Sequence, residues 1–387
     1  LNGSPFDVQK KSARLDYARA RTEEAGLDLI YVNLVGGQDE LVFDGDSFVM
    51  GRKGVLAQRA CSWQDSLLKT NWKLTKNKWC CQNQDEIEHV DQIEEIYKAI
   101  TLGLRDYVNK NGFPGVLIGL SGGIDSALSA AVAVDAIGPE RVHCVMMPSP
   151  YTSKQSIDDA TEIADLLECR LDRISIEPAM AAFDEMLKPS FANVTSDTTE
   201  ENVQSRSRGL SLMALSNKFG YMVLSTGNKS EMSVGYATLY GDMCGGYSVL
   251  KDLYKTTVFA LSKWRNANIP EGVLGPVGPV MGQQVISKPP SAELKPDQKD
   301  EDSLPPYEKL DDILYGLIED ELSASEIAAT GHDPETVEKV WRMLDQAEYK
   351  RRQAPPGVKI SSRAFGRDRR YPITNGFTGY NPRGNEL

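Results

Sequence analysis

Histidine is scarce in this sequence, and several other features are missing from it. Only His89, His143 and His332 occur, and they lie far apart, so a histidine-rich zinc site is not expected. No two of the six cysteines form a C-x-x-C pair, and we expect reduced thiols. The longest apolar run, residues 127–134, is much shorter than the about 20 residues that cross a bilayer. We therefore expect no membrane segment.

The charge balance is acidic, because 43 lysine and arginine residues stand against 55 aspartate and glutamate residues, a net charge of −12. Such a chain has no general electrostatic attraction to nucleic acid or to anionic lipid. A hydrophobic content of 41% in 387 residues is typical of a folded protein of about two domains. No secretory signal opens the sequence, so we expect a cytoplasmic protein.

The first part of the chain has short apolar runs separated by turn signals. Residues 27–35 are interpreted as a buried strand, residues 36–39 as a turn, and residues 40–43 as a second strand. Residues 62–85 are polar and lack a clear period, and we interpret them as a linker zone. A helix is predicted over residues 87–110, where apolar residues recur every three or four positions.

Strands and helices then alternate along the chain. The apolar pattern predicts strands at 115–120, 142–147, 173–176 and 221–225, and helices at 127–137, 156–169 and 200–219. Strands separated by helices of this length indicate a parallel sheet covered on both faces. Ligands of such sheets bind beyond the carboxyl ends of the strands.

The strongest motif lies between the first of these strands and its helix, and it is Ser121-Gly122-Gly123-Ile124-Asp125-Ser126. Paired glycines allow a sharp turn that exposes backbone N–H groups, and the helix N-terminus adds a positive dipole. Both are suited to a pyrophosphate group. Asp125 fits a Mg²⁺ ion that bridges the carboxylate to phosphate oxygens. The bland alternative is a capped turn into a helix, and the Walker loop is excluded because no Gly-Lys-Ser/Thr follows.

This motif resembles that of the N-type ATP pyrophosphatases, and four further segments narrow the resemblance to NAD synthetase. These segments are residues 201–208, 225–231, 235–242 and 252–256, in this order behind the first motif. The resemblance implies a doubly wound parallel five-stranded α/β sheet of the adenine nucleotide alpha hydrolase-like type, with strand order 3-2-1-4-5. It also implies ATP-dependent amidation of deamido-NAD to NAD⁺ through an acyl-adenylate, with release of AMP and pyrophosphate.

The resemblance assigns residues to three sites. It implies that ATP is bound by Gly119, Leu120, Ser121, Gly122, Gly123, Ile124, Asp125, Ser126, Thr226, Lys255 and Ser291. It implies that deamido-NAD is bound by Asn202, Arg206, Glu231, Tyr236, Asp242 and Lys350, with Lys350 supplied by a partner subunit or by the C-terminal tail. Asp125 and Glu231 would hold Mg²⁺, and Asp125, Glu231 and Lys255 would be catalytic. A homodimer or larger homo-oligomer is implied as well.

The proline-rich stretch between Pro270 and Pro306 is predicted to contain a lid. Residues 288–302 carry many charges and few apolar side chains, and Ser291 offers a hydroxyl to phosphate. Closure of such a lid would exclude water from an acyl-adenylate. Two or three helices are predicted beyond it, between Tyr307 and Gln353.

The branch of the family is indicated by two features. The ammonia-only branch carries an arginine near ATP at the end of the second strand, where this chain has Met146-Met147-Pro148-Ser149. Residues 31–47 resemble the latter part of a nitrilase-type glutaminase domain. We therefore expect a glutaminase remnant with a linker over residues 1–83 and a synthetase domain over residues 84–387. The nucleophilic cysteine of such a glutaminase has no match here, so free ammonia is the expected nitrogen source.

Three alternative functions explain the motifs less well. GMP synthetase and asparagine synthetase use the same chemistry but lack the 225–231 and 235–242 segments. A tRNA-thiolating relative is disfavoured by the charge of −12 and by the absence of a reactive cysteine pair. A regulatory nucleotide-binding module would not need Glu231 and Lys255 beside the turn.

Overall fold

The structure, a computed structural model, describes residues 2–82, 91–295 and 298–374. Its centre is a five-stranded sheet whose neighbouring strands are all parallel. In spatial order the strands are β10 (Arg170–Arg173), β9 (Val142–Met146), β8 (Val116–Gly119), β11 (Met222–Ser225) and β12 (Tyr247–Ser248). Counted along the chain, this order is 3-2-1-4-5, which confirms the predicted doubly wound topology.

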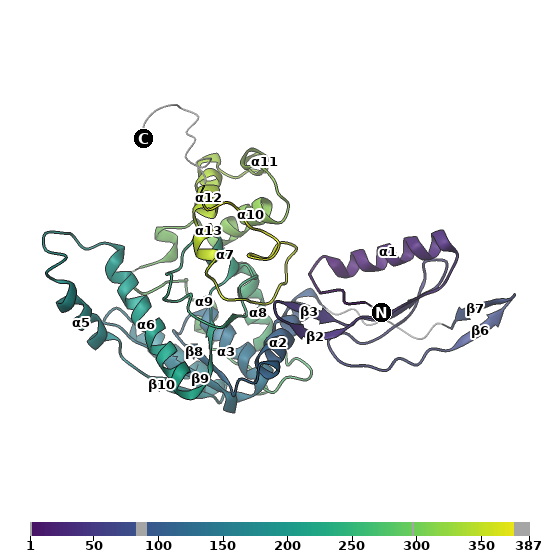
Figure 1. Cartoon of the computed structure of the whole chain (residues 1–387), viewed down its shortest axis with the longest axis horizontal. Helices are drawn as coiled ribbons and strands as arrows, with labels where there is room; N and C mark the ends of the chain where they lie inside the picture. The colour runs from purple at the N-terminus through teal and green to yellow at the C-terminus, as the bar shows by residue number, and fades with distance from the viewer. Residues whose placement is uncertain (1, 83–90, 296–297, 375–387) are drawn as a thin grey trace.

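Helices cover both faces of this sheet, as Figure 1 shows. Ile118 points to a large core that it shares with α2 (Gln92–Lys110), α3 (Ile124–Ile137), α4 (Lys154–Leu166) and α8 (Lys255–Ala267). The neighbouring Leu117 points to the opposite face and packs with α5 (Glu177–Leu187) and α6 (Thr198–Phe219). The strands are apolar throughout because both of their faces are buried.

The N-terminal part is built differently, from α1 (Lys10–Ala25) and antiparallel strands. These strands are β1 (Leu29–Tyr31), β4 (Phe48–Met50) and β5 (Leu56–Arg59) in one sheet, β2 (Val35–Gln38) with β3 (Leu41–Asp44), and β6 (Trp72–Thr75) with β7 (Lys78–Cys81). Figure 1 shows this part beside the parallel sheet, with β2 and β3 next to α2. Phe6, Val42 and Trp63 belong to the same core as α2 and α3.

Two predictions for residues 27–39 are wrong. The single predicted strand is split into β1 and β2, and Gly36 and Gly37 lie inside β2 rather than in a turn. A Cβ on Gly37 would stand 3.2 Å from the Cα of Gly103, so glycine here allows close packing of β2 on α2. The turn comes later, at Asp39, whose φ is 54°.

The linker predicted over residues 62–85 is also wrong in part, because it contains the β6–β7 hairpin. Its strands are largely exposed on both faces, so no alternation of apolar and polar residues marks them. Lys76 and Asn77, both with positive φ, form the two-residue turn. The start of the predicted helix at residue 87 lies outside the described residues, which enter α2 at Gln92.

The third strand was predicted at 173–176 but is observed as β10 at Arg170–Arg173. The predicted residues still run along β9, because the backbone N–H groups of Ile174 and Ile176 bond to the Met146 and Pro148 carbonyls. Three further elements were not predicted, namely α1, α5 and β12, the last of which has only two residues.

Short helices surround the carboxyl edge of the sheet. They are α7 (Lys229–Val234), α9 (Gln283–Ser287), α10 (Tyr307–Ile318), α11 (Ala324–Ala329), α12 (Pro334–Gln346) and α13 (Glu348–Arg351). Four of them follow Tyr307, where two or three were predicted. Within the described ranges no helix has the length and apolar character needed to span a bilayer. All six cysteines are free thiols, as expected.

Candidate active site

The Ser-Gly-Gly motif forms the turn that joins β8 to α3, as predicted. The Ser126 hydroxyl donates to the Gly123 carbonyl and accepts from the Ser121 backbone N–H, while the Ser121 hydroxyl accepts from the Gly123 N–H. Gly122 has a φ of +82°, and a Cβ there would stand 2.3 Å from the Ser156 carbonyl oxygen. Only glycine therefore allows this turn to lie against α4. The turn is held rigidly, with the N-terminus of α3 facing the carboxyl edge of the sheet.

Asn228 links the two predicted metal ligands. It caps the N-terminus of α7, where its side-chain oxygen accepts from the Glu231 backbone N–H at 3.0 Å. Its amide nitrogen donates to Asp125 Oδ1 at 2.8 Å. Asn228 is fully buried, so one side chain fixes α7 and the Asp125 carboxylate relative to each other.

Lys255 lies between the same two carboxylates. Its Nζ is 2.5 Å from Asp125 Oδ2 and 3.1 Å from Glu231 Oε1. The two carboxylate oxygens, both bonded to one nitrogen, are therefore no more than about 6 Å apart, near enough to share a divalent cation. The side chains come from α3, α7 and α8, which all begin at the carboxyl edge of the sheet. The predicted convergence of Asp125 and Glu231 is observed.

Burial shapes the electrostatics of this group. Burial raises the pKa of Glu231 to about 7, and Lys255 offsets this only in part. Burial would lower the pKa of Lys255, but Asp125 and then Glu231 reverse the effect and hold it above its usual value. Asp300 adds a third carboxylate nearby, and burial raises its pKa as well. With several acids around a single ammonium, the group retains excess negative charge and favours an added cation.

These residues open onto one cavity of about 530 Å³. Most of the residues predicted from the resemblance line it: Gly119, Leu120, Ser121, Gly123, Ile124, Asp125, Ser126, Asn202, Thr226, Glu231, Tyr236, Asp242, Lys255, Ser291 and Lys350. Residues from β8, α6, β11, α7 and the 288–302 segment thus meet at the carboxyl edge of the sheet, where parallel sheets bind ligands.

Two predicted residues do not line the cavity. Gly122 faces α4 instead. Arg206 lies exposed on α6, and its Nε donates to the Leu239 carbonyl. Lys350 was expected from a partner subunit or from the C-terminal tail, and it reaches the cavity from α13, in the C-terminal part of this same chain. Its Nζ donates to the Gly235 and Ala237 carbonyls at 2.7 and 2.6 Å.

Asp242 and Asn202 are held by the loop after α7. The Asp242 carboxylate accepts from the Thr238 N–H at 2.7 Å, and the Asn202 side chain accepts from the Thr238 hydroxyl at 2.9 Å. Burial raises the pKa of Asp242 to about 6. This end of the cavity therefore carries an acid and a lysine, Lys350, that is fixed by carbonyl groups.

The 288–302 segment covers part of the cavity. Glu293 accepts from the hydroxyls of Ser153 and Ser156 at the start of α4, and Lys288 donates to Ser156. The Ser291 hydroxyl donates to the Gln298 carbonyl at 2.5 Å, so its proton is engaged within the segment itself. The segment thus lies against α4, and whether it moves stays a prediction.

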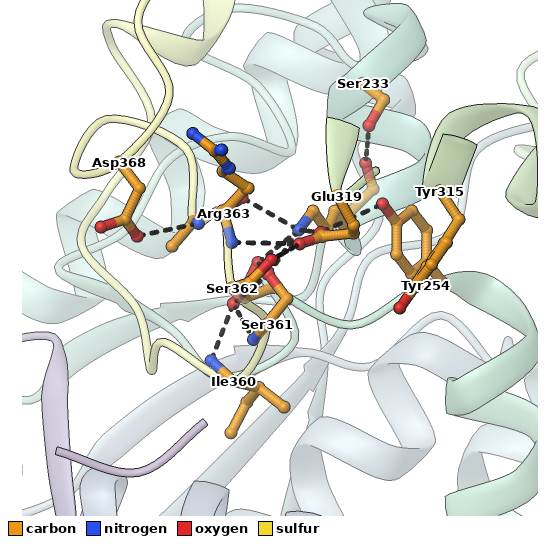
Figure 2. A network of polar contacts seen from close by, with 12 residues as sticks. Ser233, Tyr254, Tyr315, Glu319, Ile360, Ser361, Ser362, Arg363 and Asp368 are labelled. Carbon is orange, nitrogen blue, oxygen red and sulfur yellow. Dashed lines mark hydrogen bonds and ion pairs between the residues drawn. The ribbon is translucent and has the colours of Figure 1, made fainter. Parts of the chain in front are cut away.

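A buried ionic cluster anchors α7 from behind, as Figure 2 shows around Glu319. Lys229 is fully buried, and its Nζ lies 2.8 Å from Asp252 Oδ1 and 2.5 Å from Glu319 Oε1. Glu319 accepts from Ser362, and Asp252 accepts from Ser361 and from two backbone N–H groups of the same C-terminal segment. This cluster ties α7, which carries Glu231, to α10 and to residues 360–363.

Sequence reasoning missed three residues that shape the site, namely Asn228, Arg208 and Asp300. The signal for Asn228 was present, because an asparagine three residues before a glutamate predicts a helix cap. Arg208 lines the cavity from α6 and was quoted only as part of a motif. Asp300 accepts from Tyr307 at 2.8 Å, and its other oxygen is buried without a partner among the described residues.

Comparison with known proteins decides the family. The family model described as NAD synthase matches residues 96–354. A glutamine-dependent NAD(+) synthetase of Acinetobacter baylyi is 50% identical over 377 residues, which cover 97% of this chain and 68% of the relative. The chain belongs to the NAD synthase family. Structures of other NAD synthetases have been solved, and the fold of this chain is similar to theirs.

Two solved structures place this NAD synthase among its relatives. A glutamine-dependent NAD+ synthetase of Acinetobacter baumannii in complex with ADP matches with a TM-score of 0.70 and 46% identity, over 98% of this chain and 68% of the other. An NH3-dependent NAD synthetase of Campylobacter jejuni matches 68% of this chain and 96% of its own, with a TM-score of 0.53 and 25% identity. As a NAD synthase, the chain is an ATP-dependent carbon–nitrogen ligase of NAD biosynthesis.

Proposed function

We propose that the cavity converts deamido-NAD to NAD⁺ through an acyl-adenylate. A nicotinate carboxylate oxygen attacks the α-phosphorus of ATP, and pyrophosphate leaves. Ammonia then attacks the carbonyl carbon, the bond to AMP breaks, and the nitrogen loses a proton. The observation that supports this proposal is the meeting of Asp125, Glu231 and Lys255 beside the Ser-Gly-Gly turn. An activated acyl group needs mainly positioning and charge stabilisation, which such a site supplies.

The phosphate end of ATP would lie against the turn and the start of α3. The N-terminus of α3 has no side-chain cap, so the first backbone N–H groups of that helix and its dipole favour an anion there. Thr226, at the end of β11, would contact the adenosine part. Lys255 is held charged by its two carboxylates and would stabilise the charge that develops on the departing pyrophosphate.

We also propose that Asp125 and Glu231 hold Mg²⁺. Two carboxylates near one another and open to a cavity fit this ion, which takes a few carboxylates together with phosphate oxygens and water. Among the described residues, no three Asp, Glu, His or Cys side chains are close enough together to hold a metal ion by themselves. When bound, the ion would neutralise the leaving pyrophosphate.

Deamido-NAD would occupy the end of the cavity lined by Asn202, Tyr236, Asp242 and Lys350. Lys350 is fixed by two carbonyls and is suited to a substrate anion. Arg206 is exposed and does not line the cavity, so it would contact the substrate only where the substrate extends out of the cavity. ATP and deamido-NAD would then meet near Glu231, where the carboxylate is activated.

The division into two parts is likewise a proposal. Residues 1–83 would be the latter part of a glutaminase-type domain with a linker, and residues 84–387 the synthetase domain. The separate antiparallel strands of the first part support this division. None of Cys61, Cys80 and Cys81 lies in the Cys-Glu-Asp setting of a glutaminase nucleophile. We therefore propose free ammonia as the nitrogen source of this 387-residue chain. The location that we propose is cytoplasmic.

The nitrogen source provides the first test of the function. The purified chain is expected to form NAD⁺ from deamido-NAD, ATP and ammonium chloride, with only background turnover on glutamine. The ammonium-driven rate is expected to climb with pH, because NH₃ and not NH₄⁺ is the nucleophile. Chromatographic quantification of NAD⁺ with each nitrogen source from pH 7 to 9 checks this. Absence of NAD⁺ with ammonium would refute the function, and robust glutamine-dependent formation would refute the nitrogen source.

We further propose that the chain forms a homodimer through α5 and α6. No residue of α5 is buried in the chain alone, although the helix contains Met186 and other apolar residues. Met186, Leu210 and Val194 are 68%, 65% and 68% exposed, on α5, on α6 and on the connection between them. Exposed apolar side chains on two helices in contact with each other are typical of an interface.

One charge introduced into this apolar surface is expected to dissociate the dimer. Leu210→Asp should shift the molecular mass in solution from a dimer toward a monomer, because an uncompensated charge is costly in an apolar interface. Lys263→Asp, on the exposed side of α8, is the control and should leave the mass unchanged. Sedimentation analysis measures both. A monomeric parent chain, or a dimer insensitive to Leu210→Asp, contradicts this surface.

A further inference from the structure

Arg208 lines the cavity from α6. It is partly buried, and its Nε donates to the carbonyl of Met147, just beyond the end of β9, at 3.0 Å. Its neighbour Gly209 allows α6 to lie close to the loop after α7, since a Cβ there would stand 2.9 Å from the Tyr240 carbonyl oxygen. The Arg208 side chain is thus fixed at its Nε, and the residue lines the cavity.

The terminal nitrogens of Arg208 are uncommitted within the described residues. No hydrogen bond or ion pair from them to another described residue is present; the Nε bond is the side chain's only one. Glu293 and Asp242 act on Arg208 through their charge, but neither lies within ion-pair distance. Burial lowers the pKa of Arg208, which shows that its charge is poorly solvated. A charged group in this state is stabilised by an anionic ligand.

The other cations of the cavity are already engaged. Lys255 is bonded to two carboxylates, Lys350 to two carbonyl oxygens, and Lys288 to the Ser156 hydroxyl and to Glu293. Four basic residues line the cavity. Arg208 is the one whose terminal nitrogens have no acceptor in the described part of the chain. A nucleoside triphosphate with several negative charges needs such a donor.

The position of Arg208 indicates which part of the substrates it meets. Glu293, on the 288–302 segment, and Asp242, at the proposed deamido-NAD end, both line the cavity and both act on Arg208 through their charge. The α-phosphate is the group that joins these two regions, because it belongs first to ATP and then to the acyl-adenylate. A planar guanidinium fork matches two phosphate oxygens with parallel hydrogen bonds.

We propose that Arg208 binds the α-phosphate of ATP and of the acyl-adenylate. This proposal rests on the proposed function for the reaction, but its binding step can be measured without turnover. The α-phosphorus keeps its anionic oxygens when the carboxylate displaces pyrophosphate and again when ammonia displaces AMP. Arg208 would therefore hold the phosphate through both steps, and would add to the transition-state stabilisation of the first.

The test compares AMP with adenosine, which differ only in the α-phosphate. Titration calorimetry should show that the parent chain binds AMP more tightly than adenosine. Arg208→Gln should weaken AMP binding about 10- to 100-fold and change adenosine binding less than about threefold, since one charged hydrogen-bond pair is lost. Arg208→Lys should give an intermediate loss, because an ammonium keeps the charge without the fork. Arg342→Gln, an exposed arginine on α12, is the matched control.

The outcomes separate this proposal from the proposed function. A selective loss of AMP affinity, with about a 100-fold fall in kcat/KM for ATP, supports the phosphate contact. Equal losses for AMP and adenosine would overturn it in favour of contact with the base or ribose, and unchanged affinities would overturn it outright. If the parent chain forms NAD⁺ but Arg208→Gln binds AMP normally, the α-phosphate contact of Arg208 is refuted and the proposed function stands. A parent chain that forms no NAD⁺ refutes the function.

Discussion

Replacing Lys255 with methionine is expected to lower kcat/KM for NAD⁺ formation about 10³-fold, a loss comparable to removing a preorganised donor to a developing anion. Lys255 is buried, and it is the cation that contacts both Asp125 and Glu231. Its removal takes away the positive charge nearest the phosphate-binding turn. It also removes the cation that lowers the pKa of Glu231, so that pKa should rise further.

Two companion variants separate catalysis from folding. Lys263→Met removes a lysine from the exposed side of the same helix and should keep activity within about twofold, because surface substitutions seldom matter. Lys255→Arg keeps the charge and should fold well, but the larger guanidinium cannot take the same position between the carboxylates. Steady-state kinetics with saturating ammonium, together with circular dichroism, measures these effects. A folded Lys255→Met variant with near-normal kcat/KM would contradict the assigned role.

Replacing Lys229 with methionine is expected to destabilise the protein by about 3–5 kcal/mol, the cost of leaving buried charges without their partner. Asp252 and Glu319 would both lose the ammonium that now lies within 2.8 Å of each. For a domain of this size, we expect the melting temperature to fall by about 10 °C. Activity should fall too, because the cluster positions α7 and therefore Glu231.

Lys98→Met is the control for this second prediction, since Lys98 pairs with Glu94 on the surface of α2. Such a pair is worth about 1 kcal/mol or less. Pairing Lys229→Met with Glu319→Gln should recover part of the lost stability, because it removes one of the stranded charges. Thermal denaturation followed by circular dichroism measures all four proteins. An unchanged melting temperature for Lys229→Met would show that the cluster does not hold α7 in place.

The sequence was most informative where chemistry and local structure coincide. The Ser-Gly-Gly turn could be placed because a short apolar strand precedes it and an apolar helix follows it, and the structure has β8 and α3 there. The order of the strands came from the family resemblance, since nothing in the spacing of apolar residues says which strands are neighbours. The convergence of Asp125 and Glu231 followed from that order.

The failures have physical causes of a different kind. Gly36 and Gly37 suggested a turn, but their lack of a side chain serves contact between β2 and α2, which is a tertiary property. The β6–β7 hairpin is exposed on both faces, so no burial pattern reports it. Arg208 and Asp300 enter the cavity from segments far apart in the sequence, and only the folded chain shows that they share it.

The central claim is that the carboxylate of deamido-NAD is activated by bonding to the α-phosphorus of ATP in this cavity. Supplying the chain with ammonium, ATP and deamido-NAD labelled with ¹⁸O in both nicotinate carboxylate oxygens tests it directly. The acyl-adenylate route predicts that one labelled oxygen remains with the α-phosphate, so mass spectrometry should find AMP carrying one ¹⁸O. Unlabelled AMP, or ADP with the label in inorganic phosphate, would contradict it.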